Sequence, residues 1–276
     1  MKYFAVLLGL LRDRDAFLND IQNEVRLERK IIALLVSSCI FFAVYGAIIG
    51  SSSSWLQLIA SAIKLPALYL ITLVICLPTL YFFDILFGSK LSFGQYITLM
   101  LTNMAVISVL LFSFAPVTLF FLISVPDYDF FLLLNVAFFG VTGFVGVKLF
   151  YEGMLSLTVP KTLPSAEEQA IAPLPASQST SSEDRHDFTD EIIAVKDTQD
   201  SRIKTKEPSA SKLQDSRRKL LQAWLILYGL VGSQLGWTLR PFFGAPGEPF
   251  QLFRPDIGGN FYINVIQTLL HFLFNY

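Results

Sequence analysis

The chain is poor in the residues that most enzymes and metal sites need. Of its 276 residues only 16% are charged, and it has two cysteines and two histidines, whereas about 25% charge is usual for a soluble domain. It contains no CxxC or Cys/His spacing that suits a metal, and no HExxH, Gly-x-Ser-x-Gly or phosphate-loop motif. We therefore predict no catalytic residue, no metal and no cofactor, and no charged stripe suggests a nucleic-acid partner.

What the chain has in abundance is long apolar sequence, with 53% hydrophobic residues and 26 Phe. A helix rises about 1.5 Å per residue, so roughly 20 apolar residues match a hydrocarbon core of roughly 30 Å. Five runs reach this length: Ile31 to Gly50, Pro66 to Phe87, Tyr96 to Val125, Phe130 to Val147 and Leu220 to Leu239. The sequence predicts an all-α polytopic membrane helix bundle of about five transmembrane helices.

The charged residues divide the chain into segments. Residues 1–30 have apolar side chains spaced by threes and fours between charges, which predicts an amphipathic helix on the inner membrane surface or against the bundle. Residues 31–157 hold transmembrane helices 1 to 4, and residues 158–213, rich in Pro, Ser and charge, predict a disordered cytoplasmic linker. Residues 214–240 hold transmembrane helix 5, and residues 241–276 form an outer loop and an interfacial helix over 260–274.

The distribution of Lys and Arg predicts the orientation. With five spans and the N-terminus inside, 18 basic residues lie inside and three, Lys64, Arg240 and Arg254, lie outside. No small-residue cleavage site follows the N-terminal segment, so we expect it to be retained. The sequence favours a cytoplasmic N-terminus and an external C-terminus in a bacterial inner or thylakoid-type membrane.

Two irregularities distinguish the apolar runs. The run from Tyr96 to Val125 is too long for one straight crossing, and Pro116 predicts a break or kink near Phe114 to Pro116. A serine cap and Trp55 predict a short outer-surface helix that ends before Pro66. We expect any specific site to lie where the broken third run meets the arginine-bearing outer loop.

A few polar side chains fall inside the predicted spans. Polar groups at membrane depth are costly, so each is either a hydrogen bond between helices or part of a polar path. The candidates for intramembrane polar contacts are Asp84, Asn103, Asn135 and Gln234. Asp84 lies within about one turn of the inner surface, where Lys90 or Arg29 could pair with it. Cys39 and Cys76 fall near the middles of two spans and suit simple packing.

The outer arginines are the candidate contacts for an anion, a lipid or a protein partner. Arg240 and Arg254 are each followed by proline, and a guanidinium there suits a lipid head group, a partner's carboxylate or a salt bridge within the chain. Small residues also recur, and they predict close helix packing, either within the bundle or between protomers. They are Gly140, Gly143 and Gly146 in one run and Gly229, Gly232, Ser233 and Gly236 in another.

The stretch Gln234-Leu-Gly-Trp-Thr-Leu-Arg-Pro-Phe-Phe-Gly244, with Phe253-Arg-Pro255 after it, resembles the end of uncharacterised bacterial, cyanobacterial-type multi-pass membrane proteins. At the level of span count alone the chain is also similar to the five-span YIP membrane-trafficking family, but the acidic Tyr-Gly-Pro type motif of that family is absent. Neither resemblance implies an activity, and no functional residue is carried over.

These observations predict a non-enzymatic integral membrane protein. The leading hypothesis is a scaffold or assembly factor of a membrane complex, whose N-terminal helix and inner loop contact protein partners in the membrane or cytoplasm, with a homo-oligomer as an option. The alternative is a small transporter or channel subunit with a polar path near Asn103, Asn135 and Gln234. A continuous polar cavity at mid-membrane would favour transport, and a dry, packed bundle would argue against it.

Overall fold

The computed structural model describes residues 2–86, 89, 91–125, 127–158, 207–243, 250–253 and 259–274, and every regular element among them is a helix. The chain divides into two units, residues 1–158 with 220–276, and Val159–Lys219. The predicted linker over 158–213 falls mostly outside the described residues. The helices are α1 (Lys2–Arg12), α2 (Arg14–Gln22), α3 (Leu27–Gly50), α4 (Trp55–Leu86), α5 (Phe93–Ser124), α6 (Tyr128–Thr158), α8 (Glu207–Thr238) and α9 (Phe261–Phe274).

Four of these helices are long and apolar enough to cross a membrane. They are α3, α4, α5 and α6, each with at least 24 residues. The prediction of a multi-pass, all-α membrane protein is confirmed. Among the described helices, α8 is not one of the four that are long and apolar enough.

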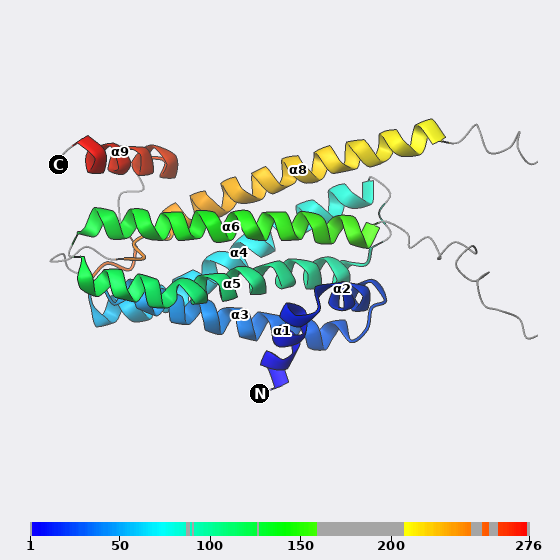
Figure 1. Cartoon of the computed structure of the whole chain (residues 1–276). Coiled ribbons are helices and arrows are strands. Elements are labelled where there is room, and N and C mark those ends of the chain that lie inside the picture. The colour runs from blue at the N-terminus through cyan, green and yellow to red at the C-terminus, as the bar shows by residue number, and fades with distance from the viewer. Residues whose placement is uncertain are drawn as a thin grey trace, which may run out of the picture. The chain divides into compact units, whose positions relative to one another are not determined.

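The centre of the bundle is α5, which packs between α3 and α6 (Figure 1). Its buried positions include Leu101, Ala105 and Leu111, each at most 2% exposed. α3 buries large rings toward two neighbours: Tyr45, at 0% exposure, lies beside Thr118 of α5, and Phe42, also at 0%, stacks on Tyr69 of α4. A helix that is apolar all round needs neighbours on several sides to be buried so deeply, and α5 has them.

The prolines do not interrupt the long helices. Pro66 and Pro78 lie inside α4, and Pro116 lies inside α5. The predicted short helix before Pro66 is therefore wrong. Of the break or kink predicted near Pro116, the break is ruled out, because α5 continues through this proline. A proline removes one backbone hydrogen bond, but ending a helix within hydrocarbon would leave several groups unpaired, so a continuous helix costs less. The serine cap is real, since the Gln57 N–H donates to Ser54 Oγ over 3.2 Å.

In place of one helix over residues 1–30, the chain forms α1 and α2 over residues 2–22, and residues 27–30 already belong to α3. The chain breaks at Asp13, whose carboxylate caps α2 by accepting from the Ala16 N–H at 2.9 Å. After α2, Glu24 and Arg26 adopt left-handed φ values of 56° and 52°, which turn the chain into α3. Three apolar residues of α2 are buried, namely Phe17, Leu18 and Ile21. Both helices pack against the bundle, α1 on α3 and α2 on α5 and α6. A position at the inner membrane surface stays a prediction.

A close backbone contact joins α3 and α4. A Cβ added to Gly46 would lie 2.4 Å from the Ser61 carbonyl oxygen, and one added to Gly50 would lie 2.6 Å from that of Gln57. Only glycine permits such an approach of two backbones. Gly46-Ala-Ile-Ile-Gly50 is a GxxxG sequence, the usual signal for this contact in membranes, and the sequence reasoning overlooked it.

From residue 220 onward, α8 lies antiparallel to α4. The Trp224 indole N–H donates to the Thr79 hydroxyl over 3.4 Å, and further along a Cβ on Gly236 would lie 3.8 Å from the Leu68 side chain. Just beyond the helix, the Pro241 carbonyl accepts from Lys64 at 3.2 Å. Residues 224–241 therefore follow α4 backward from near its C-terminus to its first turns.

The glycines that predicted close packing divide into two sets. Gly146 faces Ile107 of α5, where an added Cβ would lie 2.5 Å from the Ile107 side chain. Gly140, Gly143 and Gly229 have nothing within 4 Å of an added Cβ. In each of the two predicted stretches of small residues, therefore, only some of the residues contact another helix of this chain.

The predicted C-terminal helix is present as α9, and none of its residues is buried. Its contacts with the bundle are few. The His271 imidazole lies 3.5 Å from the Asp129 carboxylate, and the Tyr262 hydroxyl lies 2.8 Å from that of Ser233.

Candidate functional site

A buried hydrogen-bonded cluster joins α3, α5 and α6. The Tyr45 hydroxyl donates to Asn135 Oδ1 at 2.8 Å and lies 3.3 Å from the Thr118 hydroxyl. The Asn135 amide donates to the Phe131 carbonyl at 2.8 Å. All three side chains are 0% exposed. Of the two roles left open for Asn135, the geometry is that of a hydrogen bond between helices.

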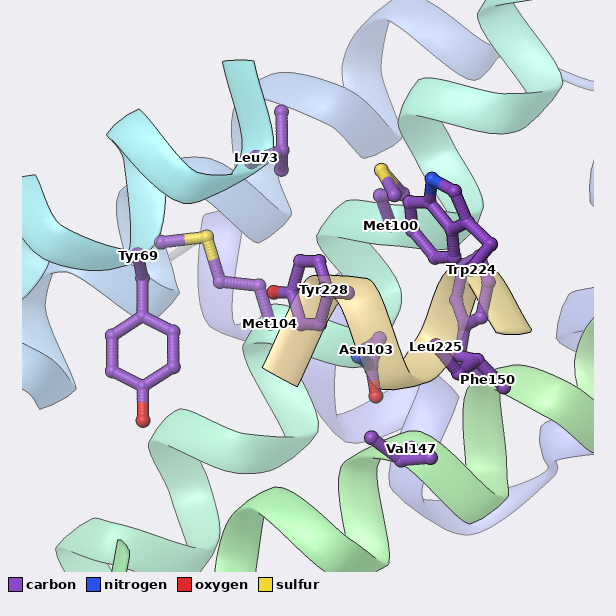
Figure 2. A pocket seen from close by; sticks show the side chains of 10 residues that line it. All are labelled: Tyr69, Leu73, Met100, Asn103, Met104, Val147, Phe150, Trp224, Leu225 and Tyr228. Atoms are coloured by element: carbon purple, nitrogen blue, oxygen red, sulfur yellow. The ribbon is translucent and has the colours of Figure 1, made fainter. Parts of the chain in front are cut away.

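Asn103 lies in different surroundings. It is 8% exposed, and its Oδ1 has no hydrogen-bond partner among the described residues. A small cavity of about 10 Å³ adjoins it where α4, α5, α6 and α8 converge. Figure 2 shows Tyr228 on one side of Asn103 and Trp224 with Phe150 on the other. A volume of about 10–15 Å³ is what one water needs.

A larger cavity adjoins the other side of Asn103. It has a volume of about 170 Å³ and is bounded by residues of α1, α2, α5 and α6. Its lining is mostly apolar, with five leucines, Phe150, Val106 and Gly153, and the polar members are Arg14, Thr102 and Asn103. Asn103 is therefore the predicted polar residue that does border on cavities, whereas neither described cavity includes Asn135.

Asp84 is buried near the C-terminal end of α4, at 4% exposure. Its carboxylate accepts from the Tyr96 hydroxyl at the start of α5, and that hydroxyl lies 2.7 Å from the hydroxyl of Ser89. Of its predicted partners, Lys90 falls outside the described residues. Asp84 serves to connect the end of α4 with the start of α5.

Gln234 does not approach the asparagines. It lies on the exposed side of α8, as Gln222 does. The structure thus separates the predicted polar path into three surroundings: a dry cluster at Asn135, cavities at Asn103 and an exposed face at Gln234.

Of the two outer arginines, the structure describes Arg240, and Arg254 falls outside the described residues. The Arg240 guanidinium carbon lies 3.4 Å from the centre of the Trp237 ring, a cation–π contact. The Trp237 indole N–H donates to the Gly259 carbonyl at 3.1 Å. Arg240 therefore helps to position the end of α8 beside the segment that leads into α9.

The sequence reasoning missed a polar face at the start of α4 that holds the outer segment after α8. The Gln57 amide donates to the Pro241 carbonyl at 2.8 Å, and the Ser61 hydroxyl donates to that of Phe242. The Lys64 ammonium donates to the carbonyls of Pro241 and Leu252. We call Gln57, Ser61 and Lys64 the α4 polar face.

A signal for the α4 polar face exists in the sequence. Its three residues are spaced by four and three, which places them on one side of a helix that is otherwise apolar. Lys64 is only 5% exposed, and its ammonium also lies 4.7 Å from the Phe253 ring centre. The described residues 241–243 and 250–253 of the outer segment therefore dock on α4. A site where the outer segment meets the third run stays a prediction.

The remaining groups that could support chemistry are dispersed. Among the described residues no group of three or more His, Cys, Asp or Glu could hold a metal ion. Cys76 is buried and Cys39 is half-buried.

Comparison with protein-family models, curated proteins and solved structures finds no match to this chain. The length and the apolar composition of the described helices define the class. The protein is a helical, multi-pass integral membrane protein with four candidate spans.

Proposed function

We propose that this protein is a non-enzymatic scaffold or assembly factor of a membrane complex, and that α1 is one of its contact surfaces. The observation that carries the proposal is the unoccupied apolar face of α1. Leu7 and Leu10 are each 3% exposed against the bundle, whereas Leu8 and Leu11 on the other side are 65% and 50% exposed.

The position of α1 favours a partner within the membrane. The Tyr3 carbonyl accepts from the Ser37 hydroxyl at 3.5 Å, and the Phe4 ring centre lies 5.8 Å from that of Phe41. Ser37 and Phe41 lie in the middle part of α3, so α1 packs along the first half of that apolar helix. A short helix there adds apolar surface outside the bundle, where another membrane protein can pack.

The competing class, a small transporter or channel subunit, has less support. Its three predicted path residues, Asn103, Asn135 and Gln234, lie in three separate surroundings. The larger described cavity is mostly apolar and lies toward α1 and α2. A packed polar cluster such as Tyr45 with Asn135 is typical of helix association.

The proposal includes five crossings, with a cytoplasmic N-terminus and an external C-terminus in a bacterial inner or thylakoid-type membrane. The course of α8 along α4 supports the fifth crossing, because residues 224–241 cover the same length of the bundle as α4 residues 79–57. The excess of Lys and Arg before α3, after α6 and before α8 supports the orientation.

Site-specific photocrosslinking in cells tests the scaffold. We expect a photoreactive amino acid at Leu8 to give one adduct of defined mass with another membrane protein or with a second copy. The same group at Val74, which is 66% exposed on α4, is the matched control and should react with lipid alone. Lipid adducts alone at Leu8 would contradict the proposed contact surface.

Purification in mild detergent is a second test of the proposed scaffold function. The crosslinked partner should co-purify with the wild-type protein and be lost from a Leu8→Ala, Leu11→Ala variant that folds normally. A Val74→Ala, Ile75→Ala variant is the control, since both residues are also exposed. Recovery of the protein alone, active in a lipid-dependent transport assay, would favour the competing class.

A further inference from the structure

The larger cavity between α1, α2, α5 and α6 extends along the helices. Its wall on α5 runs from Leu99 to Val106, two turns of one helix face, which is a length of roughly 10 Å. Its volume is about 170 Å³. An apolar cavity of about 150 Å³ holds benzene, so this one has room for about six carbons.

The inner wall of this cavity is apolar and closed. Leu10, Leu99 and Phe150 are each 3% exposed. Leu18 of α2 is also buried. An apolar cavity stays free of water, and an empty one forfeits packing contacts for every group that lines it. A hydrocarbon occupant restores those contacts.

The polar side chains of the wall do not favour a polar ligand. The Thr102 hydroxyl donates to the Thr98 carbonyl within α5 at 2.7 Å. Asn103 Oδ1 lies toward α6, since a Cβ added to Gly146 would be 3.1 Å from it. Both oxygens are thus directed at helix backbone, and the cavity specifies no hydrogen bond to an occupant.

The open edge of the cavity lies at α1 and the start of α2. Leu11 is 50% exposed there. Arg14 donates to the Glu152 carboxylate at 2.9 Å and to the Leu149 carbonyl at 2.8 Å. The carboxylate balances the charge of Arg14, so the edge does not select an anionic ligand. Because α5 and α6 are candidate membrane spans, a lipid chain can reach this edge from the side without crossing water.

We propose that this cavity holds part of one acyl chain of a phospholipid. The chain enters past Leu11, and about six of its carbons lie between α5, α6 and the two N-terminal helices. The head group stays outside the cavity, beyond Arg14. A lipid in this position is a bound component of the protein, distinct from the lipids that surround the bundle. The inference does not depend on the proposed scaffold role.

Photolabelling from within the bilayer tests this assignment. The full-length protein is reconstituted in dioleoyl phosphatidylcholine vesicles with a series of phosphatidylcholine probes, each of which carries a diazirine at a different carbon of one chain. We expect adducts at Leu10 and Leu99, which at 3% exposure only a chain inside the cavity can reach. Val74, 66% exposed on α4, reports the surrounding lipid and should also be labelled. Mass spectrometry of proteolytic peptides locates the adducts.

A variant that fills the cavity should remove the chain. Gly153→Leu does so, because its new Cβ would lie 3.0 Å from the Leu99 side chain and 3.8 Å from that of Leu18. The adduct at Leu99 should fall at least about fivefold, the effect expected of overpacking an occupied cavity. The adduct at Val74 should not change. Gly140→Leu is the matched control on α6, since an added Cβ there has nothing within 4 Å, and should leave both adducts unchanged.

Two results would overturn the proposal. Adducts at Val74 without any at Leu10 or Leu99, across the whole series of probes, would rule out a chain in the cavity. An unchanged Leu99 adduct in folded Gly153→Leu would mean that the chain reaches Leu99 from elsewhere. Should Gly153→Leu fail to fold, Val106→Phe enlarges a half-buried side chain of the α5 wall and takes its place, with the same expected loss.

Discussion

At the scale of single residues, the hydrogen bond between Tyr45 and Asn135 should stabilise the contact between α3 and α6. We expect Tyr45→Phe and Asn135→Leu each to lower the free energy of unfolding. Their double-mutant cycle should give a coupling of about 0.6 kcal/mol and at most about 1.7 kcal/mol, the average and the maximum for hydrogen bonds between membrane helices. Reversible unfolding in mixed detergent micelles measures it.

The matched control for this cycle is Thr142→Val. Thr142 is also 0% exposed on α6, but its hydroxyl donates within its own helix, to the Phe138 carbonyl at 2.8 Å. Combined with Tyr45→Phe it should show no coupling. A coupling as large as that of Asn135 would mean that the effect is not due to the hydrogen bond.

At the scale of helix pairs, Gly46 sets the distance between α3 and α4. Gly46→Ala should destabilise the protein by about 1–3 kcal/mol, because the new methyl meets a backbone carbonyl that cannot move aside alone. Gly140→Ala is the control, since an added Cβ there has nothing within 4 Å. Thermal unfolding in detergent should separate the two variants, and equal melting temperatures would exclude a tight α3 to α4 contact.

The α4 polar face should hold the outer segment in place. Lys64→Met removes the donor to the Pro241 and Leu252 carbonyls. We expect the rate of chymotrypsin cleavage at residues 250–253 to rise at least about tenfold, since a charge-assisted hydrogen bond contributes about 1.5 kcal/mol or more. Lys148→Met changes an exposed lysine of α6 and should leave the rate unchanged.

At the scale of the whole molecule, the number of crossings fixes the sides of the two ends. With five crossings, a cysteine at Tyr262 in α9 should react with a membrane-impermeant maleimide in intact cells, and one at Glu28 should react only after the cells are opened. Cys39 and Cys76 are first replaced by alanine. With four crossings, residues 28 and 262 would lie on the same side of the membrane. Labelling of both cysteines in intact cells, or of both only after the cells are opened, would therefore contradict the proposed fifth crossing.

The sequence could predict the class of the fold because hydrophobic length is a local property. Every long run that it indicates corresponds to a helix, and α9 was expected over nearly the same residues. It could not predict the continuity of α4 and α5 across Pro66 and Pro116. The rule that proline ends a helix comes from proteins in water, which satisfies the freed carbonyl groups, and hydrocarbon does not.

The candidate site was less predictable than the fold. Asn135 and Gln234 carry similar amide groups in apolar sequence, yet one is fully buried and the other is exposed. The difference depends on which side of each helix faces a neighbour, and a helix that is apolar all round does not reveal this. The cavity beside Asn103 depends in turn on how α1 and α2 pack beside α5 and α6.

The antiparallel course of α8 along α4 has a consequence for biosynthesis. Translation proceeds at roughly 5–20 residues per second, so the roughly 60 residues between α6 and residue 220 delay the last apolar segment by several seconds. The first four long helices thus have time to insert and associate before it leaves the ribosome. We expect residues 1–158 and 207–276, made as separate chains in one cell, to assemble into a complex that survives purification. A first fragment that is degraded when made alone would mean that late docking of α8 is needed for its stability.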